Sequence, residues 1–343
     1  MLSVPLHTRV ISLRLRWSGP REVFVDGRLI DLRKRSIVPL GASLRGPGVV
    51  HDMCTRVWVD VDKQTISRVD PEMRTFPYVS SEHTGGENCA GPIDAVQGLV
   101  GTRLDDSYPK VVHSLIGGPR GCFHIFTLLR LTGPAVLAAL ADYRVQTRLG
   151  GDSPVNPGET LWARSVSVDA FKGEGLGVSL HGTLTDTFQR GGPPEDGFAA
   201  EELLSGMEVM ADFQTSFPDL ELAEVSGRRR QLLPGFGNAG AWEELSKLKQ
   251  LEGVGARKGF SLRVQEILDD EAGRRPETHL LFMMAPVVMQ SLPGLIEEMD
   301  LAPGKSDRRS STSSATNSCH MWRSDGPLDR MTSGAAPPQK PER

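Results

Sequence analysis

Residues 9–35, RVISLRLRWSGPREVFVDGRLIDLRKR, occur in this chain in two versions, the second being RSVSVDAFKGEGLGVSLHGTLTDTFQR at residues 164–190. The two stretches align without a gap at an offset of 155 residues, and the same offset relates His124 to His279. Seven of the 27 aligned positions are identical: Arg9/Arg164, Ser12/Ser167, Val23/Val178, Gly27/Gly182, Leu29/Leu184, Asp31/Asp186 and Arg35/Arg190. The repetition predicts an internal duplication, with two similar halves related by a pseudo-twofold axis.

Each half begins with alternating apolar and polar residues, the pattern of strands joined in hairpins. The period then lengthens to about 3.6 residues, which predicts three helices in each half. The expected strands of the first half cover residues 10–17, 22–31, 55–61 and 65–69. Its expected helices cover residues 92–100, 108–116 and 122–143, with a break at Gly133-Pro134. In the second half, strands are expected at 210–216 and 220–225 after the repeated hairpin, and helices at 242–252, 260–270 and 277–290. The order ββββααα predicts an α+β fold with antiparallel sheets and helices on one face.

Three regions follow from these patterns. Residues 1–148 form the first repeat and residues 159–300 a degenerate second repeat, separated by the Gly- and Pro-rich linker LGGDSPVNPG. Residues 304–343 lack apolar periodicity and are expected to be disordered. A docked segment is expected within this tail at residues 319–328, which begin with Cys-His-Met-Trp.

Composition narrows the classes of function. The 343 residues have a formal net charge of −4, from 39 Lys and Arg against 43 Asp and Glu, which argues against a nucleic-acid-binding surface. The most apolar stretch, residues 279–296, contains two prolines and is short for a membrane span. The first ten residues, MLSVPLHTRV, lack the apolar core of a signal peptide. With four cysteines in so long a chain, reduced thiols and a cytoplasmic location are expected.

Four residues with the chemistry of metal ligands occur in the first half alone: His51, Asp52, Cys89 and Cys122. The second half has Met207-Glu208, a loop residue and Glu277 at the corresponding places. One imidazole, one carboxylate and two thiolates suit Zn²⁺ or iron, and a position at a helix start favours the thiolate of Cys122. The alternative is that both cysteines are buried as small apolar residues and that His51 caps a strand. His124 of the first half recurs as His279 in the second half, which favours a packing role for both histidines.

The first half resembles a bacterial family of domains of unknown function, number 2889. The resemblance rests on His7-Thr8-Arg9, His51-Asp52-Met53, Pro77-Tyr78 with Cys89, and Gly121-Cys122-Phe123-His124. It covers residues 6–145 well and the second half weakly. Phe123 replaces the usual Thr of the last motif, and Cys89 lies later than the family pattern places it. The family implies a site at these residues and leaves the reaction open.

The element order is also similar to that of iron–sulfur scaffold and sulfur-acceptor proteins. In those proteins a carboxylate and three thiolates lie at corresponding sheet and helix ends. This likeness implies that His51-Asp52 stand where a Cys and an Asp stand in the scaffold, and that Cys89 and Cys122 replace two further ligands. A His in place of a Cys favours a mononuclear Zn or Fe site over cluster assembly.

Two classes of function follow. The first is a cytoplasmic metal-dependent lyase or hydrolase acting on a small organic acid or acyl thioester in catabolism, with Cys122, His51 and Asp52 as catalytic residues and the second half completing the cavity. The second is a non-enzymatic scaffold or accessory protein that carries metal or sulfur. Both predict a small-molecule ligand, with neither nucleic acid nor membrane as partner, and a homodimer is left open.

Overall fold

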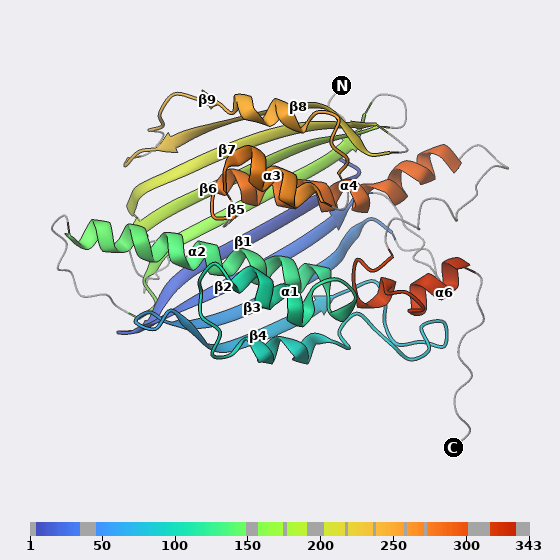
Figure 1. Cartoon of the computed structure of the whole chain (residues 1–343), viewed down its shortest axis with the longest axis horizontal. Helices are drawn as coiled ribbons and strands as arrows, with labels where there is room; N and C mark the ends of the chain where they lie inside the picture. The colour runs from blue at the N-terminus through green and yellow to red at the C-terminus, as the bar shows by residue number, and fades with distance from the viewer. Residues whose placement is uncertain are drawn as a thin grey trace, which may run out of the picture.

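The strands build one antiparallel sheet that runs through the whole protein. The computed structural model describes residues 5–34, 46–148, 157–173, 177–190, 202–216, 219–235, 238–256, 259–270, 273–300 and 316–333. The strands are β1 His7–Gly19, β2 Glu22–Arg33, β3 Gly48–Asp60, β4 Thr65–Thr75, β5 Thr160–Lys172, β6 Val178–Arg190, β7 Glu202–Ser216, β8 Glu221–Leu232 and β9 Glu243–Glu244. Their order is β4-β3-β2-β1-β5-β6-β7-β8-β9, so the β1/β5 pair joins the two halves into a single sheet (Figure 1).

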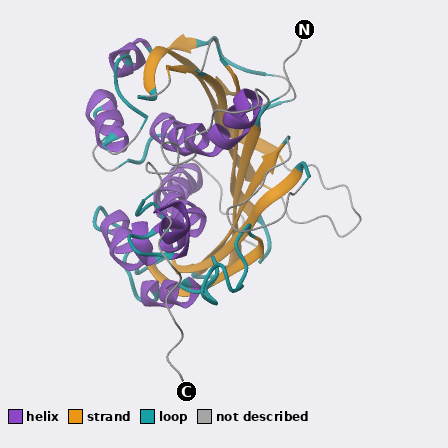
Figure 2. Cartoon of the chain, turned by 90° about the vertical axis from the view of Figure 1, so that its right-hand side faces the viewer, coloured by secondary structure: helices purple, strands orange, loops and turns teal. Residues whose placement is uncertain are grey.

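The helices lie along one side of the curved sheet (Figure 2). They are η1 Ile93–Leu99, α1 Tyr108–Ile116, η2 Gly118–Arg120, α2 Phe123–Arg148, η3 Ser246–Leu251, α3 Phe260–Leu268, α4 Pro276–Asp300, η5 His320–Trp322 and α6 Pro327–Ser333. The α+β class, with an antiparallel sheet and several helices, is therefore as predicted. Instead of separate sheets, the two halves share one.

Two glycines let the long helices pack closely on the sheet. A Cβ atom at Gly27 of β2 would lie 3.6 Å from the Leu128 side chain of α2, and also 3.0 Å from Thr55 Oγ1. A Cβ atom at Gly182 of β6 would lie 3.0 Å from both Leu280 and Met284 of α4. The contacts at Gly182 are tight, so a larger residue there would push α4 away from the sheet. At Gly27 the tight contacts are with the neighbouring strands, while α2 lies at ordinary van der Waals distance. The repeated glycines thus help to fix α2 and α4 over the inner face.

The expected elements differ from the structure in three places. Residues 51 and 52, expected just before a strand, lie inside β3, which begins at Gly48. Two of the expected helices, at 92–100 and 242–252, are 3-10 helices over Ile93–Leu99 and Ser246–Leu251. Helix α2 continues through Pro134, where a break was expected. Packing accounts for this continuity, because the Gly133 backbone lies against the buried Tyr108 ring, whose hydroxyl donates to the Leu129 carbonyl at 2.8 Å.

The predicted tail falls partly on described residues. Residues 316–333 contain η5 and α6 and contact the first half, where the His320 N–H donates to the Gly121 carbonyl at 2.8 Å. Residues 304–315 and 334–343, expected to be disordered, lie outside the described residues.

One stretch of α2, Phe123–Ala141, is long and apolar enough to cross a membrane. In the structure 72% of it is buried inside the protein, where it packs on the sheet. Core helices of soluble proteins meet the same length and composition criteria, so this is weak evidence for a span.

Candidate metal centre

Asp31 is the centre of a buried polar cluster on the helix-covered face of the sheet. It is paired with Arg9 on β1 and with His51 on β3. Directly opposite residues of neighbouring strands point to the same face, so the three side chains meet there. Arg9 donates two hydrogen bonds to the carboxylate, from Nε to Oδ1 at 2.8 Å and from Nη2 to Oδ2 at 2.9 Å. The register of three strands therefore assembles this ion pair.

His124 completes the cluster from the first turn of α2. Its Nε2 lies 3.0 Å from Asp31 Oδ2, and His51 Nδ1 lies 3.0 Å from the same oxygen. The two imidazole rings are stacked, with their centroids 3.8 Å apart. One ligand atom from each of Asp31, His51 and His124 lies within 4.8 Å of the other two. Two imidazole nitrogens and a carboxylate oxygen thus converge on one point.

The charges in the cluster are fixed by burial and by Arg9. Burial alone would raise the pKa of the Asp31 carboxyl, but the Arg9 guanidinium and hydrogen bonds from His124, His51 and His7 hold it well below its usual range. Burial, together with the nearby His51, lowers the pKa of His124 to about 3. Near neutral pH the centre therefore contains an ionised carboxylate and a neutral His124, the protonation states that a metal ligand needs.

Two further residues surround the centre. His7 Nε2 lies 3.2 Å from Asp31 Oδ1. From α4 in the second half, the side-chain amide nitrogen of Gln290 lies 2.9 Å from His124 Nε2, while the Gln290 carbonyl accepts a hydrogen bond from Arg33 at 3.1 Å. The second half thus contributes one polar group to the cluster of the first half. The side chain of His51 is 14% exposed, so the centre reaches solvent on that side.

The second half contains a reduced version of the same arrangement. Arg164 donates two hydrogen bonds of 2.6 Å to Asp186, as Arg9 does to Asp31. The residue paired with Asp186 on the next strand is Met207, where the first half has His51. His279 Nδ1 contacts the Arg164 guanidinium, and its Nε2 donates to the Gly273 carbonyl at 2.7 Å. Both nitrogens of His279 are therefore engaged within the protein, and the Arg–Asp–His group of this half serves packing.

The cluster lies within a region that matches a known family. Residues 7–137 match the family described as "Protein of unknown function (DUF2889)". The predicted resemblance of the first half to this family is thus confirmed. No curated protein and no solved structure matches the chain. The likeness to iron–sulfur scaffold proteins therefore rests on element order alone.

The DUF2889 region holds every predicted site residue but does not bring them all together. His51 lies in the centre. Asp52, its neighbour in β3, points to the opposite face, because successive side chains of a strand alternate. There its carboxylate accepts two hydrogen bonds from Arg28, at 2.9 and 2.8 Å. The expected pairing of His51 and Asp52 as ligands fails for this reason: both lie within a strand.

Cys122 and Cys89 lie at the edge of the centre. Cys122 Sγ is 3.8 Å from His124 Nδ1, on the side of the ring away from Asp31. Burial raises the pKa of the Cys122 thiol to about 12, and burial likewise raises the pKa of Cys89. Cys89 lies in the loop between β4 and η1, where its N–H donates to the Tyr78 carbonyl at 3.2 Å. Both thiols are therefore protonated near neutral pH in this structure.

Sequence reasoning missed Asp31 and His124, which complete the centre inside the DUF2889 region. Both recur in the second half, and the recurrence of His124 as His279 favours a packing role over a metal-binding one. The strand register carries the missing signal. In the repeat frame Asp31 lies opposite His51, whereas Asp186 lies opposite Met207. The aspartate occurs in both halves, but only in the first half does a histidine on the neighbouring strand lie opposite it.

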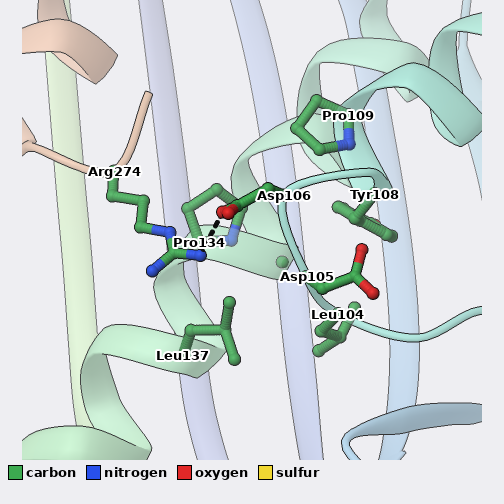
Figure 3. A pocket seen from close by; sticks show the side chains of 9 residues that line it. Leu104, Asp105, Asp106, Tyr108, Pro109, Pro134, Leu137 and Arg274 are labelled. Carbon is green, nitrogen blue, oxygen red and sulfur yellow. Dashed lines mark hydrogen bonds and ion pairs between the residues drawn. The ribbon is translucent and has the colours of Figure 1, made fainter. Parts of the chain in front are cut away.

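A small pocket lies elsewhere, where the two halves meet (Figure 3). An ion pair between Arg274 of the second half and Asp106 of the first crosses it. Its lining is Leu104, Asp105, Asp106, Tyr108, Pro109, Gly133, Pro134, Leu137 and Arg274. None of these residues belongs to the Asp31 centre, so the pocket is separate from it.

Proposed function

We propose that the first half binds a divalent metal ion through Asp31 Oδ2, His51 Nδ1 and His124 Nε2. The observation that carries this proposal is the spacing of these atoms. Each histidine nitrogen lies 3.0 Å from the carboxylate oxygen. Ligand atoms bound at 2.0–2.1 Å around a tetrahedral Zn²⁺ are about 3.3 Å apart. Small side-chain movements therefore suffice to admit the ion.

The donor set favours Zn²⁺ or Fe²⁺. Two imidazoles and one carboxylate are a common set for catalytic zinc and for non-haem iron, and both leave coordination positions open. The partly exposed side of His51 gives water or a substrate oxygen access to those positions. A metal held in this way polarises a carbonyl or lowers the pKa of bound water. These capacities support a metal-dependent lyase or hydrolase that acts on a small organic acid or acyl thioester.

The residues around the ligands prepare them for the ion. Arg9 keeps Asp31 ionised, and burial keeps His124 neutral. Near neutral pH neither side chain therefore has to be deprotonated from its acid form before it can bind the metal. Arg9 also shares the carboxylate with the metal and lowers its effective negative charge, which weakens the hold on the ion. His7 supplies a polar contact that orients Asp31, as outer-shell groups do in known metal sites. The Gln290 amide contacts Nε2 of His124, the nitrogen assigned to the metal, so this amide has to move aside when the ion binds.

An internal duplication accounts for the difference between the halves. Ile11 of β1 is paired with Val166 of β5, and these two residues are themselves 155 positions apart. A pseudo-twofold axis through this pair would map β1 onto β5 and the Arg9–Asp31 pair onto Arg164–Asp186. We infer that both halves inherited the Arg–Asp–His packing group and that the first half gained His51 as an additional ligand.

The second candidate is a non-enzymatic metal-carrying scaffold or accessory protein. The depth of the centre favours it, because Asp31 is fully buried and His124 is 8% exposed. A closed coordination sphere is typical of a structural site, and an open position is typical of a catalytic one.

Cobalt substitution distinguishes the two functions. Protein loaded with Co²⁺ should change its visible spectrum on addition of azide if a coordination position is open, and it should then hydrolyse acyl thioesters of small acids when loaded with Zn²⁺ or Fe²⁺. An unchanged spectrum together with inactivity on a thioester panel would favour the scaffold. The variant His279→Gln serves as the control, since it alters the corresponding helix position without touching the proposed ligands.

A further inference from the structure

Three of the four cysteines gather in one region, although they lie far apart in the sequence. Cys89 precedes η1, Cys122 directly precedes α2, and Cys319 directly precedes η5. Cys54 lies apart from them on β3, where Asp52, Glu72, Arg28 and Arg74 surround its thiol. The C-terminal segment, residues 316–333, brings the third thiol to the first half.

Hydrogen bonds and ion pairs hold this segment against both loops that carry the other two thiols. The His320 N–H donates to the Gly121 carbonyl at 2.8 Å, which links the residues next to Cys319 and Cys122. Standard bond lengths then limit the Cα atoms of those cysteines to no more than roughly 9 Å apart. Near Cys89, the Glu87 carboxylate pairs with His320 at 3.0 Å and with Arg323 at 2.8 Å.

The thiols also influence one another electrostatically. Burial is the main cause that raises the pKa of Cys89, and the neighbouring Cys122 and Cys319 raise it further. Cys319 acts in the same direction on Cys122, whose pKa burial raises. A Cβ atom at Gly91 would lie 3.8 Å from His320 Nε2, so residues on both sides of Cys89 approach the residue next to Cys319. Three partly buried thiols brought to one region can together bind a cation that favours sulfur.

We propose that Cys89, Cys122 and Cys319 form a second site, which binds a thiophilic d¹⁰ cation, Zn²⁺ or Cu⁺. Sulfur ligands select these ions over Mg²⁺, Ca²⁺ and Mn²⁺. The site differs from the Asp31 centre in its donors and is independent of it, although the ring of His124 lies between them, with Nε2 toward Asp31 and Nδ1 toward Cys122.

Binding at this site would add a further link between the C-terminal segment and the first half, which the segment already contacts. Within the part of the chain that the structure describes, the Asp31 centre is the one group whose three ligand atoms lie within 4.8 Å of one another. The three sulfur atoms therefore have to approach further to reach the Zn–S distance of about 2.3 Å. The cation thus fastens residues 316–333 in place.

Titration of the metal-free, reduced full-length protein with Cd²⁺ tests the proposal, since Cd²⁺ gives an ultraviolet charge-transfer band when thiolates bind it. Wild-type protein should develop this band at one equivalent, and Cys319→Ser should weaken Cd²⁺ binding at least tenfold. Cys54→Ser is the matched control and should leave the titration unchanged. A Cys319→Ser titration that overlays the wild-type curve would overturn the site.

A second readout uses the wild-type protein alone and does not depend on the folding of a variant. Alkylation followed by peptide mass spectrometry should show that one equivalent of Cd²⁺ protects Cys89, Cys122 and Cys319 together. Equal alkylation of Cys319 with and without Cd²⁺ contradicts the proposal. His51→Met separates this site from the Asp31 centre, since it should spare the charge-transfer band even though it removes a ligand of that centre.

Discussion

His51 and Asp31 lie side by side on β3 and β2, with His51 Nδ1 3.0 Å from Asp31 Oδ2. The corresponding pair in the second half is Met207 and Asp186. A thioether at this place offers a weak ligand to Zn²⁺ or Fe²⁺, whereas an imidazole offers a strong one. Under the proposed function, the difference at this single pair separates a metal centre from a packing group.

Replacement of His51 by the residue of the second half should remove metal binding and keep the fold. The His51→Met side chain is of similar length and lies at a partly exposed position, so we expect a change in unfolding free energy of less than about 1.5 kcal/mol. The affinity for Zn²⁺ should fall at least about 100-fold, since one of three ligands is lost. Competition with a chromophoric chelator measures this in the Cys89→Ser/Cys319→Ser background, which removes the proposed thiol site, and an affinity within threefold of the background protein would argue against His51 as a ligand.

Asp31→Asn and Asp186→Asn should destabilise the protein to a similar extent. Each variant leaves a buried arginine, Arg9 or Arg164, without its ionised partner, which typically costs about 3–5 kcal/mol. Urea denaturation of the metal-free proteins measures both. Only Asp31→Asn should also reduce metal content. If Asp186→Asn proved neutral, the packing role assigned to the Arg–Asp–His group would be wrong.

Stability of the metal-free protein should fall as the pH is lowered from about 7.5 to 5. Burial lowers the pKa of His124 to about 3, and burial also lowers the pKa of His7 and of His279. The unfolded chain therefore binds more protons than the folded one below about pH 6.5, and stability is lost as the pH falls through that range. The lowered pKa of Asp31 acts only at more acidic pH, because its unfolded value is about 3.9.

The variant His124→Gln tests the source of this dependence. It removes one of the three histidines, so the slope of unfolding free energy against pH between 5 and 7.5 should become shallower. A slope equal to that of wild type would mean that His124 does not stay neutral in the folded protein.

Gly133→Ala should destabilise the protein, although alanine favours helices. A Cβ atom at this position would clash with the ring of the buried Tyr108. Overpacking of this kind costs about 1–3 kcal/mol, which exceeds the gain of about 1 kcal/mol from helix propensity. Gly19→Ala is the control, because a Cβ atom there meets nothing within 4 Å. Thermal unfolding of both variants checks the prediction, and a stabilised Gly133→Ala protein would contradict the packing described for α2.

The sequence predicted the fold class well, because hydrophobic periodicity reports which face of each element is buried. The sequence pattern located the hairpins and the helices that follow them. It also showed that the first half has His51 where the second half has no histidine. It failed at His51-Asp52, since the pattern did not reveal that β3 begins at Gly48, before both residues. Inside a strand the two side chains point to opposite faces, and only one reaches the centre.

The remaining proposed ligands come together through long-range contacts that sequence spacing does not report. Asp31 reaches His51 through strand register, and it reaches His124 because α2 packs over the sheet. A main-chain hydrogen bond between His320 and Gly121, almost 200 residues apart in sequence, brings the region of Cys319 near that of Cys122. Its segment was expected to dock, but the pattern carried no information about where.

Elemental analysis by plasma mass spectrometry tests the proposed centre most directly, on wild-type protein, His51→Met, His124→Gln and the second-half control His279→Gln. The thiol site is kept out of the measurement by using the Cys89→Ser/Cys319→Ser background in all four proteins. We predict about one Zn or Fe per chain in the background protein and in His279→Gln, and less than about a tenth of that in His51→Met and His124→Gln. Equal metal content in all four proteins, or none in the background protein after reconstitution, would contradict a metal centre at Asp31, His51 and His124.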